Sequence, residues 1–323
     1  MKLEANSLTK NIIKEKPKVS FVIPALNEEL EISDTISKIR KLRLIDSEII
    51  VVDNGSKDKT RSLSMQSGAK VILAPGVSIA ELRNIGSKNS LYSIIVFLDA
   101  DVCISESWEA AFLNTYKKLT ENPFVITGNR CLPENDTNPL NKYWFSRLSQ
   151  NTNESSYVNS GHMITTKLAL EALGGFNSSL STSEDYDLCA RAKTSGIQVF
   201  NDEKLIAIHK GYPKNILEFI IRELWHGSED FKSLTKINNS RVAKIAILNG
   251  ITLTISLIMS ILNRSLYYLE LYMIFAMTLS LAISTVKFGA NPIRKNIASS
   301  FFAYIYISSR TLSPLINIGR HRN

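Results

Sequence analysis

The first 100 residues alternate short apolar runs with stretches in which apolar positions recur every three or four residues. Short β-branched runs predict strands, and the longer periodic stretches predict helices. The predicted strands are Val19–Ile23, Glu48–Val52, Lys70–Leu73 and Ser93–Leu98, and the predicted helices are Glu28–Lys41, Lys59–Ser67 and Ser78–Lys88. Strands that alternate with helices in this way predict an α/β fold with a mostly parallel sheet flanked by helices.

The C-terminal quarter has a different pattern, with two long apolar stretches at residues 243–262 and 266–286. Each is about 20 residues long, which is enough for a helix to cross a hydrocarbon core of about 30 Å. Three residues separate them, so we expect a transmembrane helical hairpin. The alternative is a pair of buried helices in a soluble domain, but the 83 residues from position 241 onward leave little chain to bury both. A third stretch, 297–316, contains Arg310 and Pro314, and is expected to be interfacial or a third span.

These patterns divide the chain into three parts. Residues 1–17 form a polar tail, 18–235 an α/β domain, and 236–323 a membrane-anchoring helical region. The stretch Ile216–Trp225 is amphipathic and precedes the hairpin, so it is either an interfacial helix that lies on the bilayer or a plain core helix.

Charge follows the same division. The net charge is +8, and residues 241–323 alone carry nine basic side chains and one acid, so the rest of the chain is balanced. The basic excess is therefore not a nucleic-acid footprint, and no nucleic-acid partner is expected. Because basic residues concentrate at the outer ends of the hairpin, the positive-inside rule places the α/β domain on the cytoplasmic face of the inner membrane. The three cysteines form no close pair, which excludes a disulfide framework and a cysteine zinc site.

Polar residues follow the predicted strands at their carboxyl ends. Asn27 and Glu28 come after the first strand, Asp53 ends the second, and Asp99 and Asp101 follow the fourth. Parallel sheets bind ligands at this edge. The chain has no glycine loop of the GxGxxG or GxxxxGK[ST] type. A bound nucleotide therefore needs another means of phosphate neutralisation, and a divalent cation held by carboxylates is the usual one.

Six segments resemble, in order, the successive motifs of family 2 glycosyltransferases. They are FVIPALNEE (21–29), IIVVDNGSKDKT (49–60), ELRNIGSKNS (81–90), VFLDAD (96–101), GGF (174–176) and EDYDLCAR (184–191). The resemblance covers about residues 18–230. It implies the GT-A fold, sugar transfer from a nucleotide diphosphosugar with inversion of configuration, and a requirement for Mg²⁺ or Mn²⁺.

The same resemblance implies roles for individual residues. Asp101 would coordinate the metal and Asp185 would be the general base. The nucleotide-sugar would be bound by Pro24, Ala25, Asn27, Glu28, Asp53, Arg83, Asp99 and Ala100. Many members have two aspartates where Asp53-Asn54 stands, a departure that leaves the hydrogen-bonding capacity intact.

Two further expectations remain open between a functional and a structural interpretation. His209 is either a third metal ligand or diphosphate contact, or a hydrogen-bonded loop histidine. Asp185 is expected to act in catalysis, with Glu184 and Trp225 bordering the acceptor. The alternative is that Glu184 and Asp185 only interact favourably with the dipole of a helix that Ser183 caps.

The expected function is therefore metal-dependent glycosyl transfer to a hydroxyl of a lipid-linked saccharide or glycolipid in envelope polysaccharide synthesis. Transfer to a polyprenyl phosphate is the alternative, and it needs no base because that nucleophile is already ionised. A sugar nucleotidyltransferase is disfavoured because PALNEE is not its first-strand signature. An inactive membrane scaffold is disfavoured by the intact aspartates.

Overall fold

The computed structural model describes residues 16–134, 138–147, 157–180, 182–290 and 292–316. The chain divides into two compact units. The first comprises residues 1–131 and 155–208, and the second comprises residues 132–154 and 209–323. Most of the predicted polar tail, residues 1–15, lies outside the described residues.

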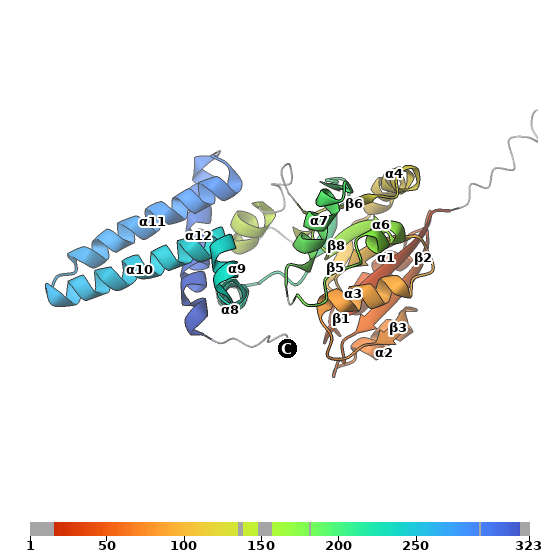
Figure 1. Ribbon diagram of the computed structural model, residues 1–323, viewed down its shortest axis with the longest axis horizontal. Coiled ribbons are helices and arrows are strands. Elements are labelled where there is room, and N and C mark those ends of the chain that lie inside the picture. Colours follow the sequence, from red (N-terminus) through yellow and green to blue (C-terminus); the bar gives the residue numbers. More distant parts are fainter. Residues whose placement is uncertain (1–15, 135–137, 148–156, 181, 291, 317–323) are drawn as a thin grey trace, which may run out of the picture. The chain divides into compact units, whose positions relative to one another are not determined.

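A seven-stranded sheet with the order β3-β2-β1-β4-β8-β6-β9 forms the centre of the first unit (Figure 1). Its strands are β1 Lys18–Ala25, β2 Asp46–Asp53, β3 Lys70–Leu73, β4 Ile94–Leu98, β6 Val125–Gly128, β8 His162–Thr166 and β9 Gln198–Asn201. The first four strands pair in parallel, β6 and β9 also pair in parallel, and β8 runs antiparallel to β4 and β6. The prediction of a mostly parallel sheet in an α/β fold is confirmed.

Both faces of the sheet are covered, which explains why strands such as β4 are apolar at every position. One face packs against α1 (Ile32–Arg40), α2 (Thr60–Gln66) and α4 (Trp108–Glu121). The other packs against α3 (Ile79–Lys88), α6 (Lys167–Ala172) and α7 (Glu184–Thr194). Helix α3 lies so close to β1 that a Cβ on Gly86 would come within 2.2 Å of the Val22 side chain.

Helix α1 begins four residues later than the sequence pattern predicts. The Glu28 backbone N–H donates to Thr60 Oγ1, and the Glu29 backbone N–H donates to Asp58. These two residues therefore form a loop instead of the first turn of a helix. Asn27 adopts a left-handed backbone conformation, with φ of 55°. The polar segment after β1 is thereby fixed as a loop, and this loop forms part of the site described below.

A small second sheet, with the order β5-β10-β7, contains β5 (Val102–Ile104), β10 (Ala207–His209) and β7 (Leu132–Pro133). The segment Asp99–Asp101 connects β4 to β5. The predicted acidic pair therefore lies in the link between the two sheets rather than on a strand, and its backbone is held from both ends.

The second unit consists of helices. They are a π-helix η1 (Asn141–Phe145), α8 (Ile216–Asp230), α9 (Leu234–Asn239), α10 (Arg241–Leu262), α11 (Tyr267–Phe288), α12 (Ile293–Leu312) and a 3₁₀ turn η2 (Ser313–Leu315). Their common core includes Trp144, Phe145, Phe219, Phe302 and Tyr306. Helix α8 packs against α12 within this unit and buries Phe219. The amphipathic stretch thus has a core face, and its lipid contact stays a prediction.

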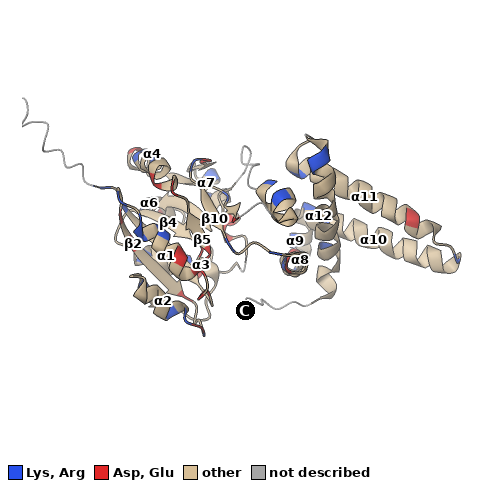
Figure 2. Ribbon diagram, turned by 180° about the vertical axis from the view of Figure 1, so that it is seen from behind, with Lys and Arg blue, Asp and Glu red and all other residues tan. Residues whose placement is uncertain are grey.

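Helices α10 and α11 are both long and apolar enough to cross a membrane. In the most apolar window of each, only 17% and 22% of the residues are buried, so few of these apolar side chains belong to a core. Figure 2 shows both helices almost free of charged side chains along their length. Their bounds agree with the two predicted spans to within two residues. Helix α12, which covers most of the third stretch, does not meet the same length and composition test among the described residues.

Candidate active site

The loops that follow β1 and β2 are joined to each other by polar side chains. The Asn27 backbone N–H donates to Ser56 Oγ at 2.9 Å, and the Asn27 Oδ1 accepts from the Lys57 backbone N–H at 2.9 Å. Thr60 Oγ1 holds the Glu28 backbone at 2.7 Å. These bonds fix the backbone of the loop in which the predicted nucleotide-binding residues lie.

Asp53 organises the second of these loops from its base. Its side chain is fully buried, and Oδ2 accepts from the backbone N–H groups of Gly55 and Ser56 at 3.1 and 3.0 Å. The Ser56 hydroxyl donates to Oδ1. Asn54, next to it, exchanges hydrogen bonds with the backbone of Val77 after β3. Asp53 therefore shapes the loop, and its predicted contact with the nucleotide base stays a prediction.

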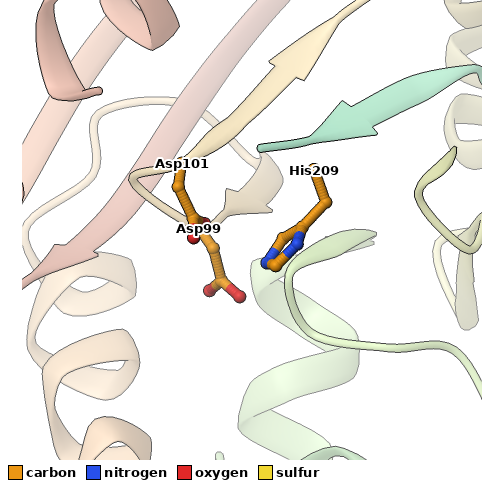
Figure 3. A group of neighbouring side chains, drawn as sticks. All are labelled: Asp99, Asp101 and His209. Carbon is orange, nitrogen blue, oxygen red and sulfur yellow. The ribbon is translucent and has the colours of Figure 1, made fainter. Parts of the chain in front are cut away.

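Three potential metal ligands flank strands β5 and β10 of the small sheet. Asp99 and Asp101 directly precede β5, and His209 is the last residue of β10. One ligand atom each from Asp99, Asp101 and His209 lie within 4.8 Å of one another. Figure 3 shows the two carboxylates and the imidazole directed into the same space. Asp101 is 6% exposed, whereas Asp99 and His209 are half-buried.

This group fits a divalent cation. Carboxylate oxygens suit Mg²⁺ and Mn²⁺, and an imidazole is acceptable to Mn²⁺ and to softer first-row metals. A divalent cation between the two carboxylates would add positive charge to a partly buried site in which Asp99 already pairs with Arg83. Burial raises the pKa of the Cys131 thiol, and the negative charges of Asp99 and Asp101 raise it further. Cys131 is therefore within electrostatic range of both carboxylates.

A buried arginine ties this group to helix α7. Arg83, on α3, is only 1% exposed. Its guanidinium donates to Asp99 Oδ1 at 2.8 Å and to Glu184 Oε1 at 2.7 Å. The resemblance implied that Arg83 lies near the nucleotide phosphates. In the structure its hydrogen bonds go to carboxylates on two different elements, and its nucleotide role stays a prediction.

Helix α7 begins at Glu184, and Asp185 is its second residue. Ser183 precedes the helix with φ of 63° and makes no side-chain cap, so Ser183 does not cap this helix through its side chain. Burial first, and then the negative charge of Glu184, raise the pKa of Asp185 to about 6. A carboxylate with a pKa near neutral is better matched to accepting a proton than an ordinary one.

A short loop before β8 connects Asp185 to the metal-binding group. The Ser160 backbone N–H donates to Asp185 Oδ2 at 3.3 Å, and its hydroxyl donates to Glu184 Oε1 at 3.2 Å. The next residue, Gly161, accepts from the Asp99 backbone N–H at 3.1 Å. A Cβ on Gly161 would come within 2.6 Å of Asp99 Oδ2. Sequence reasoning missed this loop, although the Ser-Gly pair directly before a strand was the available signal.

The remaining predicted residues have the following positions. Pro24, Ala25 and Ala100 are buried, and the Ala100 carbonyl accepts from Thr35 Oγ1 at 2.7 Å. Glu184 is 7% exposed and is held by Arg83 and Ser160. Trp225 lies on α8 in the second unit. The roles of these residues in donor or acceptor binding stay predictions.

Comparison with known proteins agrees with this geometry. Residues 20–172 match the model of the family described as Glycosyl transferase family 2. Over 226 residues the chain is 25% identical to the pre-mycofactocin glycosyltransferase of Mycobacterium tuberculosis. This alignment covers 65% of this chain and 46% of that protein. Over 96 residues it is 36% identical to the glucosyl-3-phosphoglycerate synthase of the same organism, covering 26% of this chain and 29% of that protein. The chain thus spans less than half the length of these curated relatives.

A solved structure shares the fold. It is the mannosyltransferase PcManGT from Pyrobaculum calidifontis in complex with GDP-Man and Mn²⁺, with a TM-score of 0.57 and 17% identity. The likeness covers 94% of this chain and 88% of that one. The family match covers residues 20–172, and the relatives and the shared fold agree with a family 2 glycosyltransferase domain of the GT-A fold in this part of the chain.

Proposed function

We propose that the protein is a metal-dependent, inverting glycosyltransferase. It moves a sugar from a nucleotide diphosphosugar to a hydroxyl of a lipid-linked saccharide or glycolipid, at the cytoplasmic face of the inner membrane. The observation that carries the proposal is the meeting of Asp99, Asp101 and His209 at one edge of the sheet, with Asp185 joined to that edge through the Ser160-Gly161 loop.

Donor binding is assigned to the metal group and the loops after β1 and β2. Asp99, Asp101 and His209 would hold Mg²⁺ or Mn²⁺ against the diphosphate. A metal bound there would neutralise the negative charge that develops on the departing diphosphate. The Mn²⁺ and GDP-Man in the structurally similar mannosyltransferase support this assignment.

The chain's own residues account for the rest of the reaction. The acceptor hydroxyl oxygen attacks the anomeric carbon of the sugar from the side opposite the diphosphate. A bond forms between these two atoms while the bond from the anomeric carbon to the diphosphate oxygen breaks, and the hydroxyl proton passes to the Asp185 carboxylate. A single displacement of this kind inverts the configuration. Ser160 and Glu184 position Asp185, and Arg83 balances the charge of Glu184 and Asp99.

The membrane assignment is supported by α10 and α11. Both helices have the length and composition of membrane spans, and only 17% and 22% of the residues in their apolar windows are buried. A soluble protein rarely exposes so much contiguous apolar surface. A lipid-linked acceptor is the substrate class that places a sugar hydroxyl at a membrane surface.

Mn²⁺-dependent release of nucleoside diphosphate from purified full-length protein tests the proposal. UDP-, GDP- and dTDP-sugars are screened with a lipid extract as acceptor, and one donor is expected to give turnover that EDTA abolishes. Asp185→Asn should then lower transfer by about 10²–10⁴-fold while donor binding is retained. Asp187→Asn is the matched control, because Asp187 lies on the same helix turn but pairs with Arg191 at 2.7 Å.

Two results would contradict this function. Turnover that Asp185→Asn leaves unchanged would point to an acceptor that is already ionised, such as a polyprenyl phosphate. Absence of metal-dependent donor binding in the wild-type protein, across all donors, would contradict glycosyl transfer altogether.

A further inference from the structure

The second unit contains an open pocket of about 350 Å³ beside α10. This volume lies within the usual range for small-molecule sites. One wall is a single face of α10, and the other is formed by residues directly after α8, at the end of α12 and in η2. The lining residues are Phe231, Ala246, Ile247, Gly250, Ile251, Thr254, Ile255, Thr311 and Pro314. None of them belongs to the candidate active site.

The pocket presents hydrocarbon almost exclusively. Its two hydroxyl groups are already used within the protein. Thr254 Oγ1 donates to the Gly250 carbonyl at 2.9 Å. Thr311 Oγ1 lies 3.1 Å from the Ala246 carbonyl and 2.8 Å from the Ile307 carbonyl, and it accepts from Asn249 Nδ2 at 3.0 Å. Because the lining is mainly apolar and its two hydroxyl protons are already donated within the protein, the pocket favours an apolar occupant.

The position of the pocket on α10 indicates where such an occupant comes from. Ile251 and Ile255 line it and are 52% and 55% exposed, on a helix with the length and composition of a membrane span. Gly250 forms part of the floor, where a Cβ would lie 3.1 Å from Thr311 Cγ2. Larger side chains at Gly250 would narrow the pocket. A hydrocarbon chain of the bilayer can enter it from the lipid phase.

A cation lies on the same face of α10 as part of the pocket lining. Lys244 is exposed and precedes Ile247 and Ile251 by three and seven residues, so all three share one helix face. The segment 231–244 also contains Lys232, Lys236 and Arg241 and no acid. An occupant that combines a hydrocarbon chain with a phosphate at one end would match both the pocket and this basic segment.

We propose that this pocket binds the hydrocarbon chain of the lipid-linked acceptor, with the acceptor's phosphate at Lys244. The inference rests on the proposed function, since it names the lipid part of the same acceptor. It adds a substrate-binding site on the membrane helices that is separate from the metal-binding edge. The pocket would hold the lipid carrier while the sugar hydroxyl remains free to react.

Ile251→Trp tests the chain-binding part, because an indole at this position fills the pocket. Ile261→Trp is the matched control: Ile261 is 74% exposed on the same helix and does not line the pocket. Purified proteins are incubated with a polyprenyl phosphate and with phosphatidylglycerol in equal amounts, and retained lipid is measured by native mass spectrometry. We expect the wild type and Ile261→Trp to retain the polyprenyl phosphate, and Ile251→Trp to retain at least fivefold less.

Lys244→Gln tests the phosphate contact, with Lys295→Gln as control, since Lys295 is an exposed lysine on α12 outside the pocket. Of these two lysine variants, only Lys244→Gln should weaken retention of the polyprenyl phosphate, by about three- to tenfold. Equal loss in Ile251→Trp and Ile261→Trp would overturn the proposal. Preferential retention of phosphatidylglycerol would also overturn it, by assigning the pocket to ordinary bilayer lipid. A change from dimer to monomer in Ile251→Trp alone would assign the pocket to a second copy of the chain and overturn it as well.

Mn²⁺-dependent binding of the donor without acceptor separates this proposal from the proposed function. This readout involves no lipid. If it is present in all variants and lipid retention is unaffected, only the pocket assignment fails. If it is absent in the wild type, the proposed function itself fails.

Discussion

Each unit contains one arginine that bridges two carboxylates, and the two bridges serve different purposes. In the first unit Arg83 binds Asp99 and Glu184. In the second unit Arg310 binds Glu223 at 2.8 Å and Asp230 at 3.0 Å. The chemistry of the two bridges is nearly identical. What differs is the surroundings: further acids near Arg83, and an apolar helical core near Arg310.

Around Arg83 one acid raises the pKa of the next. Asp101 and Asp185 lie in the same region, and the pKa of Asp185 is raised to about 6 by burial and by Glu184. Around Arg310 the charges hold one another in their ionised forms. Although burial alone would raise it, the pKa of Glu223 lies below its ordinary value because Arg310 and Arg222 outweigh the desolvation. A carboxyl with a raised pKa suits proton transfer, whereas a cluster of paired charges suits the joining of α8 to α12.

The largest expected effect follows from Arg83→Met. It leaves two partly buried carboxylates without their cation, which costs about 3–5 kcal/mol of folding free energy when a buried pair is broken. It also releases Asp99 and the start of α7 together, so we expect transfer to fall at least about 1000-fold, the order of a lost oxyanion-type contact. Denaturant unfolding and donor turnover measure the two effects. Lys117→Met, which removes an exposed pair to Glu121, should change neither appreciably.

Arg310→Met sharpens the comparison. A similar loss of about 3–5 kcal/mol is expected, because Glu223 would remain as a buried carboxylate without its partner. Donor binding should stay as in the wild type, since the metal-binding group has no residue on α8 or α12. Isothermal titration with Mn²⁺ and nucleoside diphosphate measures donor binding, and thermal unfolding measures the loss of stability. A variant that lost donor binding in proportion to its stability would show that the two bridges are not independent.

The titration of Asp185 gives the third prediction. The base must be ionised, so log(kcat) should rise with pH and level off above about 6. The free energy of unfolding depends on pH in the opposite direction to kcat. Because the folded pKa lies above the unfolded value, the folded state loses stability as pH rises through this interval. At pH 7 Asp185→Asn should therefore be more stable than the wild type by about 1–3 kcal/mol, at roughly 1.4 kcal/mol per pKa unit.

Urea unfolding at pH 4 and at pH 7.5 measures this difference, which should nearly vanish at the lower pH. Asp187→Asn again provides the control, since its partner Arg191 lies on the surface of the same helix. Greater stability for the wild type than for Asp185→Asn at pH 7.5 would contradict a raised pKa.

How far the sequence could predict this molecule depends on how local each signal is. The four parallel strands, the two apolar helices and the Asp99–Asp101 segment are written in continuous stretches of residues, and all were predicted with small errors at their ends. The late start of α1 was not, because it depends on Thr60 and Asp58, which lie about 30 residues away.

The ion pairs were beyond sequence reasoning for the same reason. Arg83 and Glu184 are separated by 101 positions, and nothing in their local sequences indicates that a guanidinium connects them. The resemblance placed Arg83 and Glu184 in one site but assigned them to different ligands. Likewise, the pocket on α10 requires Thr311 and Pro314 to pack beside Gly250, which no periodicity reveals.

The smallest effect is expected from Ser160→Ala, and it tests whether the first bridge positions the base. Removing the hydroxyl breaks a 3.2 Å hydrogen bond to Glu184 but keeps the backbone N–H that donates to Asp185. The loss in stability should be about 1–2 kcal/mol, typical of one hydrogen bond to a charged group. If Glu184 positions Asp185, kcat should fall about three- to tenfold at unchanged KM for the donor. Ser105→Ala, at an exposed serine pair, should leave both constants unchanged. A lower stability with unaltered kcat would mean that Ser160 only supports the fold, and that Arg83 alone sets the position of Glu184.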